Sequence, residues 1–284
     1  MIPSIIIFLP LAVCLFWMFI HCVMASRTST FAAFMCLLCS TAIFLFSDCC
    51  YYNPATSRRL LTFAHNLSQL SAPCVIPLLL IYISRQRNGR DIRIGQLTWV
   101  MVPIILFTVA EMLTGLAGRP AVEEFLGRLY SEGDGVIYST EQPELRLYYY
   151  VSVVGYRIVI ATEVISLLGA YIVTARRDGY RISNLRNFFF HGGKIDVAEL
   201  QYVNLAPIVI LSFVKLFFIR DYLQDHIWIS ALLSVLLTLF LFPVCHVAMF
   251  GSRKKVSLHD ILCAFRYNYS PKTKTELTEN LLMD

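Results

Sequence analysis

Two oppositely charged side chains lie inside long apolar stretches of the sequence. Glu111 lies near the end of the stretch 96–115, and Arg157 follows the start of the stretch 148–174. An ionisable side chain at the centre of a bilayer costs about 2.5–3.5 kcal/mol on insertion scales. At a rise of about 1.5 Å per helical residue, both lie at similar depths, about 10 Å and about 13 Å from one membrane face. We therefore expect an ion pair between Glu111 and Arg157 on sequential antiparallel helices.

More polar side chains lie in the half of the stretch 60–84 that is nearest the same face. Pro73 and Pro77 follow them, and prolines kink a helix and leave backbone carbonyls free. Together these groups predict a polar cavity that opens outward. Its candidate ligand-binding residues are His65, Asn66, Gln69, Glu111, Arg157 and Lys215. The alternative is that they only join helices and satisfy the freed backbone.

Glu163 is a further ionisable residue within an apolar stretch. It follows Arg157 by six residues, so the two side chains point about 120° apart and cannot form an i,i+4 pair. We expect Glu163 to face the inner half of the helix bundle, towards His246 or His21. A proton relay and a buried structural hydrogen bond are the two interpretations. The candidate signal-relay residues are Glu163, His246, Arg253, Lys254 and Lys255.

One enzyme pattern is present, but it is incomplete. Residues 123–128 match the EExxxR pattern of CAAX-processing-type membrane proteases, and residues 242–246 match their FxxxH. No later His has Asn or Asp four residues on, and the two segments fall near opposite membrane faces. Cys36 and Cys39 have CxxC spacing without a second pair of ligands. We therefore expect no catalytic residues, no metal, no cofactor and no enzyme activity.

The composition indicates which solvent surrounds this chain. It has 284 residues, of which 57% are apolar and only 15% are charged, and its mean hydropathy is +0.63. Soluble domains carry about 25% charged residues. The chain therefore belongs in a bilayer, and its net charge of +5 is too small and too dispersed to predict direct nucleic-acid contact.

Seven stretches are long and apolar enough to cross a bilayer core, which takes about 20 helical residues. They cover residues 4–24, 30–46, 60–84, 96–115, 148–174, 202–219 and 226–250. They lack the alternation of barrel strands. We expect an all-α fold: a seven-helix transmembrane domain over residues 1–250, followed by an amphipathic tail over residues 251–284.

The distribution of Lys and Arg predicts the orientation of this bundle. The richer set of connections holds Arg27, Arg85, Arg87, Arg90, Arg93, Arg176, Arg177, Arg181, Arg186, Lys194, Arg253, Lys254, Lys255, Arg266, Lys272 and Lys274. The poorer set holds Arg58, Arg59, Arg119, Arg128, Arg146 and Arg220. By the positive-inside rule, the amino terminus is outside and the tail is cytoplasmic. We expect an integral protein of the plasma (inner) membrane.

Two segments outside the spans also have helical signals. Residues 122–130 of the long outer loop are expected to form a short surface helix. In the tail, Ser257 and Asp260 have the spacing of a capping box, which predicts a helix over residues 258–267.

The segments 198–202 (AELQY), 220–223 (RDYL) and 256–262 (VSLHDIL), in this layout of helices and tail, resemble a known arrangement. They are similar to the multi-helix amino-terminal membrane region of bacterial membrane-anchored AraC-type transcription regulators. In that family a cytoplasmic linker leads to two DNA-binding helix-turn-helix units. Residues 251–284 are too few for such units, so the resemblance implies that this chain is the sensory half, either cut from a longer protein or acting through a partner.

Three functions remain open from the sequence. The first is a signal receptor that couples an outer signal to a cytoplasmic effector, which requires different ligand affinity for two helix packings. The second is a small-solute transporter or transporter subunit, and the third is a membrane scaffold. The expected partners are the lipid bilayer and an unknown small ligand or protein at the outer face, with a homodimer as one assembly.

Overall fold

Six helices of the described part of the chain are long and apolar enough to cross a membrane. The computed structural model describes residues 2–24, 29–53, 56–88, 94–204, 227–248 and 255–261. The six candidate spans are Ile5–Val23, Thr30–Tyr51, Arg58–Gln86, Thr98–Ala117, Pro143–Asp178 and Ile227–Ala248. The prediction of a helical multi-pass membrane protein is confirmed. The stretch predicted over 202–219 lies outside the described residues from residue 205 on.

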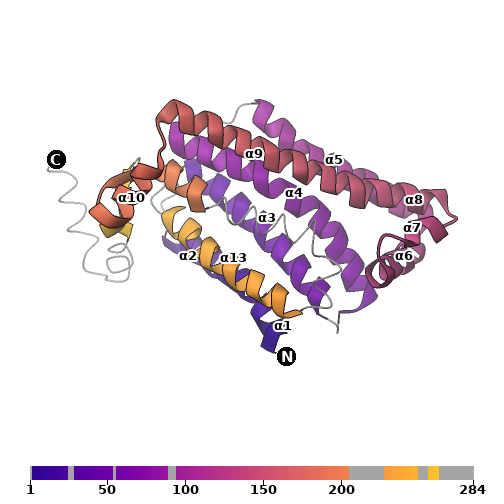
Figure 1. The fold of residues 1–284 in the computed structure, drawn as a ribbon. Coiled ribbons are helices and arrows are strands. Elements are labelled where there is room, and N and C mark those ends of the chain that lie inside the picture. The colour runs from indigo at the N-terminus through magenta and orange to yellow at the C-terminus, as the bar shows by residue number, and fades with distance from the viewer. Residues whose placement is uncertain are drawn as a thin grey trace.

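The helices form a bundle that is longer than it is wide (Figure 1). Its elements are α1 (Ile2–Ile7), α2 (Leu9–Met24), α3 (Ser29–Tyr52), α4 (Arg58–Asn88), α5 (Ile94–Ala117), α6 (Arg119–Glu132), α7 (Val136–Ser139), α8 (Pro143–Tyr149), η1 (Tyr150–Gly155), α9 (Tyr156–Asp178), α10 (Ile182–His191), β1 (Lys194–Asp196), α13 (Ile227–Ala248) and β2 (Lys255–Ser257). Residues 197–204 and 258–261 are also helical.

The bundle buries one side of each spanning helix and exposes large apolar side chains on the other. Trp17, Leu38, Leu79 and Tyr82 are fully buried in a common apolar cluster of α2, α3 and α4. On α9, by contrast, Ile165 is 70% exposed. Since such side chains are costly in water, this outer surface is the one that lipid tails cover.

The connections gather at two opposite ends of the bundle. Helices α6, α7 and α8 lie at one end, which we call the α6 end (Figure 1). Helix α10 and the two short strands lie at the opposite end, which we call the α10 end (Figure 1). Among the described residues, Arg119, Arg128 and Arg146 of the poorer set belong to α6 and α8 at the first end, and Arg186 and Lys194 of the richer set belong to α10 and β1 at the other (Figure 1).

A small apolar cluster holds the α6 end together. Val122, Leu126 and Leu129 of α6 are buried against Ala110 of α5 and Tyr148 of α8. The surface helix expected over 122–130 is confirmed, and it is longer than predicted because Pro120, which fits the first turn of a helix, starts it earlier. The loop thus packs as part of the fold.

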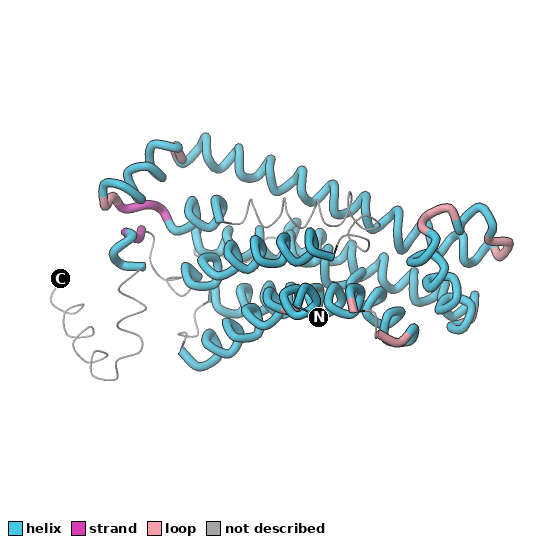
Figure 2. Tube along the Cα trace, turned by 60° about the horizontal axis from the view of Figure 1, so that its bottom comes forward, coloured by secondary structure: helices cyan, strands magenta, loops and turns pink. Residues whose placement is uncertain are grey.

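One continuous helix joins the two ends. Elements α8, η1 and α9 follow one another without a break over Pro143–Asp178, a length of 36 residues. At about 1.5 Å per residue it is about 54 Å long, and the tube in Figure 2 shows it running along the whole bundle. Its segment Tyr150–Gly155 is a π-helix, a feature that is frequent at functional sites.

At the α10 end the chain that leaves α13 returns to the chain that leaves α9. Strand β2 pairs antiparallel with β1, with Val256 opposite Ile195. Val256 is fully buried in an apolar cluster with Phe188 of α10 and Val247 of α13. We call residues 182–204 and 255–261 the α10 unit. The sequence did not predict its strands, because three-residue segments are too short to show a period of two.

Two sets of hydrogen bonds fix the end of the described tail. Ser257 N and Ser257 Oγ donate to Asp260 Oδ2, and Asp260 N donates to Ser257 Oγ, at 2.8–3.1 Å. The predicted capping box is confirmed. A ring nitrogen of His246 on α13 lies 3.0 Å from the carbonyl oxygen of Ile261, so α13 also holds the turn that follows β2.

The α10 unit should lose stability as the pH rises. Burial raises the pKa of the Glu199 carboxyl above its ordinary value, while hydrogen bonds from Asn184 Nδ2 and Arg181 N lower it and the Asp196 charge raises it again. A raised pKa means that the folded state binds this proton more tightly than the unfolded chain. The stabilisation is therefore complete below the ordinary Glu pKa and is lost as pH rises through the raised value.

Glu199→Gln tests this expectation, since the amide does not titrate. The unfolding temperature of the wild type should fall across that pH interval, and the variant should show a flatter profile. Glu144→Gln, on the first turn of α8 at the other end, is the control and should keep the wild-type profile. If the unfolding temperatures of the wild type and Glu199→Gln fall equally with pH, Glu199 is not the group that causes the pH dependence.

Candidate ligand-binding site

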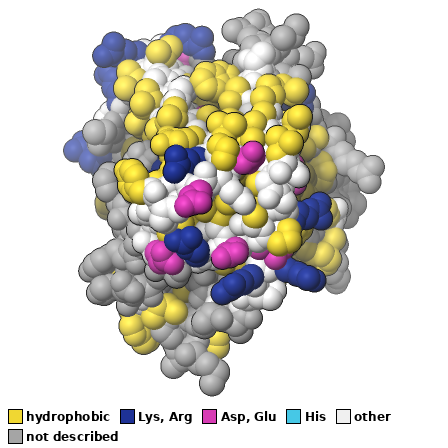
Figure 3. Space-filling view, turned by 90° about the vertical axis from the view of Figure 1, so that its right-hand side faces the viewer, with side chains coloured by type: hydrophobic (Ala, Val, Ile, Leu, Met, Phe, Trp, Pro, Cys, Tyr) yellow, Lys and Arg dark blue, Asp and Glu magenta, His cyan; other side chains and the backbone are white. Residues whose placement is uncertain are grey.

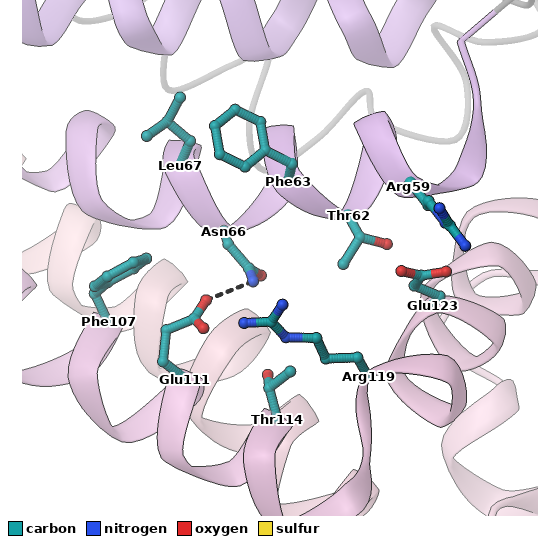
Figure 4. A pocket seen from close by; sticks show the side chains of 10 residues that line it. All are labelled: Arg59, Thr62, Phe63, Asn66, Leu67, Phe107, Glu111, Thr114, Arg119 and Glu123. Carbon is teal, nitrogen blue, oxygen red and sulfur yellow. Dashed lines mark hydrogen bonds between the residues drawn. The ribbon is translucent and has the colours of Figure 1, made fainter.

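A pocket of about 450 Å³ lies at the α6 end between α4, α5 and α6. This volume is within the range of small-molecule sites. Basic and acidic side chains lie beside one another on this face of the molecule (Figure 3). The residues that line the pocket are Arg59, Thr62, Phe63, Asn66, Leu67, Phe107, Glu111, Thr114, Arg119 and Glu123, and Figure 4 shows them together.

A chain of hydrogen bonds connects the inner part of the pocket to the long helix. Asn66 Nδ2 on α4 donates to Glu111 Oε1 on α5 at 2.6 Å. The hydroxyl of Tyr148 on α8 donates to Asn66 Oδ1 at 3.1 Å. Three helices therefore share one polar network, in which two hydrogen bonds connect Glu111 on α5 to α8. Tyr148 is fully buried, so water does not compete for its hydrogen bond.

Charged side chains from three helices face the pocket. In Figure 4 the guanidinium of Arg119 points towards Glu111 and Asn66, and Arg59 lies beside Glu123. Within the described residues, neither arginine forms an ion pair with these acids, whereas ion pairs do join Arg128 to Glu132 and Arg157 to Asp134. The pocket thus holds two positive and two negative groups with free binding capacity.

The local fold explains why both arginines are there. Helix α4 begins at Arg58, where Leu60 N donates to Ser57 Oγ, and α6 begins at Arg119 after Gly118, whose φ of 87° turns the chain sharply from α5. Both arginines therefore lie in the first turn of a helix. The positive end of the helix dipole is at that turn, so this edge of the pocket favours a negative group.

The predicted ion pair between Glu111 and Arg157 is wrong. Glu111 accepts from Asn66, and Arg157 Nη1 lies 3.2 Å from Asp134 Oδ2 between α6 and α7. The helix begins at Pro143, before the predicted residue 148, and the wider π-turns of Tyr150–Gly155 change the angular position of Arg157. Matching depth does not fix the direction in which a side chain points.

The other predicted ligand-binding residues separate into two groups. Asn66 and Glu111 line the pocket. His65 and Gln69 do not; the Nε2 atoms of these two side chains lie 2.6 Å apart, one helical turn along α4, and the His65 ring is 6.5 Å from that of Tyr148. Lys215 lies outside the described residues.

The predicted relay residues lie elsewhere. Glu163 is 1% exposed, and neither of its carboxylate oxygens has a hydrogen-bond partner among the described residues. Among the described residues, no hydrogen bond joins Glu163 to His246 or His21; a ring nitrogen of His246 lies 3.0 Å from Ile261 O and one of His21 lies 3.0 Å from Cys245 O. Lys255 is exposed in β2. Arg253 and Lys254 lie outside the described residues.

Arg59, Arg119 and Glu123 are pocket residues that the sequence pattern does not predict as site residues. The two arginines indicate only the orientation of the bundle, and Glu123 belongs to an outer loop segment that matches EExxxR. A signal was present, since Arg59 lies one residue before the predicted span 60–84 and Arg119 lies four residues after the predicted span 96–115, at the same face as Glu111. The helix α6, which brings Glu123 back over α4 and α5, was predicted only as a surface element.

The lining of the pocket combines charged and apolar side chains. No group of three or more His, Cys, Asp or Glu side chains that could hold a metal occurs in the part of the chain that the structure describes. Phe63, Leu67 and Phe107 line the pocket beside the charged groups. It can therefore hold a small molecule with both charged and apolar parts.

Comparison with known protein families, curated proteins and solved structures finds no match to this chain.

Proposed function

We propose that this chain is a membrane-embedded signal-receptor module. A signal at the α6 end, which the positive-inside rule places outside the membrane, changes helix packing and is passed to the α10 unit. The chain after α13 then acts on a cytoplasmic effector. The resemblance described above implies that this effector is a DNA-binding transcription regulator.

One observation carries the proposal: the same unbroken helix contacts both regions. Its first part supplies Tyr148, which binds the pocket residue Asn66, and its other end leads through Gly179 into α10 and β1. Because β1 pairs with β2, a displacement of this helix would move β1 and alter its contacts with β2, the strand that follows α13. The helix is thus a physical connection between pocket and tail.

Tyr148→Phe tests the connection. The variant loses the hydrogen bond to Asn66 Oδ1, which is worth about 1 kcal/mol, without leaving a large cavity. We expect amide hydrogen exchange in β1 and β2 to change by at least about twofold, since coupling along such paths is about 0.5–2 kcal/mol. The measurement is hydrogen exchange of the full chain in nanodiscs.

Tyr138→Phe is the matched control, because Tyr138 lies at the same end but is 89% exposed. It should leave exchange in β1 and β2 unchanged. If Tyr148→Phe alters exchange only at the α6 end, the pocket is not coupled to the tail and the receptor proposal fails.

A small-solute transporter is the second candidate, and Glu163 is the observation that favours it. A carboxylate buried in a bundle without a hydrogen-bond partner among the described residues is typical of substrate and proton pathways. Uptake of a solute by proteoliposomes that Glu163→Gln abolishes would favour transport over signalling.

A further inference from the structure

We propose that the pocket at the α6 end binds a zwitterion, with an ammonium group and a singly charged carboxylate or phosphodiester group joined by a short apolar spacer. The inference rests on the proposed function, since it names the class of ligand that the receptor would detect.

Charge balance is the first argument. The lining residues include two arginines and two glutamates. The two arginines would attract a simple anion, but the two glutamates would repel it. A simple cation would be attracted by the glutamates and repelled by the arginines. Each like-charge contact opposes binding and each opposite-charge contact favours it. A molecule that carries both charges meets only favourable contacts.

The arrangement of these charges is the second argument. Arg119 points towards Glu111 across the pocket (Figure 4), and among the residues that the structure describes no ion pair joins the two side chains. The anionic group fits beside Arg119 and Arg59, where the first turns of α6 and α4 add the positive ends of two helix dipoles. The ammonium group fits at Glu111, where Asn66 holds Oε1 and the rest of the carboxylate can accept from the ligand.

The apolar lining is the third argument. Phe63, Leu67 and Phe107 lie beside the charged groups rather than among them, so they accommodate methylene groups. The pocket lies where α4 begins and α5 ends, which is the level of lipid headgroups in a spanning bundle. Both a soluble amino-carboxylate and a lipid headgroup with an ammonium group therefore have the required chemistry.

The test uses sn-glycero-3-phosphoethanolamine as the zwitterionic probe, with glycerol 3-phosphate and ethanolamine as the anion-only and cation-only probes. Binding is measured by calorimetry on the full chain in phosphatidylglycerol nanodiscs. We expect the zwitterion to bind at least about tenfold more tightly than either single-charge probe, and Arg119→Gln and Glu111→Gln to abolish this preference. Equal affinity for the zwitterion and either single-charge probe would overturn the proposal.

Matched controls separate the pocket from the general charge of this end. Arg58 and Glu124 are the sequence neighbours of Arg59 and Glu123, but they do not line the pocket. Arg58→Gln and Glu124→Gln should therefore keep the preference for the zwitterion. If they remove it as strongly as the pocket variants do, the preference comes from surface charge and the site is wrong.

Nanodiscs made with phosphatidylethanolamine distinguish the two sources. A lipid ligand would occupy the pocket and abolish probe binding in these discs, whereas a soluble ligand would leave probe binding unchanged; both results retain the zwitterion site. The proposed function is judged separately. If the probe binds but hydrogen exchange in β2 does not change, the signalling proposal fails and the zwitterion site stands. If Tyr148→Phe alters exchange in β2 but the pocket shows no preference for the zwitterion, the site fails and the signalling proposal stands.

Discussion

Val256→Asp should release the tail from the bundle while the spanning helices stay folded. Val256 is fully buried among Phe188, Ile195 and Val247. An aspartate there either carries a charge into an apolar cluster or leaves an unpaired carboxyl group, and both cost several kcal/mol. The pairing of β1 and β2 covers only three residues of each strand, so its hydrogen bonds offset little of this cost.

The expected result is an increase of at least about 100-fold in the amide exchange rate of β1 and β2, which corresponds to about 3 kcal/mol. Circular dichroism should change little, because the spanning helices keep their own hydrogen bonds. Lys255→Ser is the control: Lys255 is the exposed neighbour in the same strand, and its replacement should have almost no effect.

The same variant tests how the signal would travel. If β1 and β2 separate, Tyr148→Phe should no longer alter exchange in residues 255–257 when it is combined with Val256→Asp. A tail that still responds to Tyr148→Phe would receive the change through α13 alone, and the role given to the α10 unit would then be wrong.

The sequence predicts the spanning helices well because their apolar runs are long. It places their ends less well, since a helix continues past its apolar run. The predicted span 30–46 is α3, Ser29–Tyr52, and the predicted span 148–174 belongs to a helix that begins at Pro143. Hydropathy describes the lipid-facing part of a helix, whereas its ends are decided by caps, glycines and packing.

The site was only partly predictable for a related reason. The cost of burying a charged or polar group identifies Glu111 and Asn66 as residues that need partners. It does not say which neighbour they meet, because this depends on helix rotation and on the π-segment Tyr150–Gly155. The turn at Gly118 places Arg119 at the pocket. A single glycine in a sequence does not predict the direction that the chain takes after it.

Glu163→Leu should stabilise the protein. Glu163 is 1% exposed, and its oxygens have no hydrogen-bond partner among the described residues. Burying a polar group without a hydrogen bond costs about 1–3 kcal/mol, and a leucine of similar size removes that cost. We expect the free energy of unfolding, measured by denaturant titration in mixed micelles, to rise by about 1–3 kcal/mol.

Thr162→Leu is the control, since Thr162 precedes Glu163 but is exposed on the lipid-facing surface. It should change stability by less than about 0.5 kcal/mol. A loss of stability in Glu163→Leu would show that the carboxylate is held by a stabilising partner, which would make its role structural.

A gain of stability would indicate a carboxylate that is retained for function, because functional groups in natural proteins are often kept against stability. Glu163 lies on α9 between the Tyr148 network and the α10 unit, in the helix that connects them. In a receptor, its replacement should therefore reduce the effect of Tyr148→Phe on exchange in β2. In a transporter, it should abolish uptake and leave that effect intact. The stability of Glu163→Leu thus identifies a functional carboxylate, and the exchange measurement assigns it to signalling or to transport.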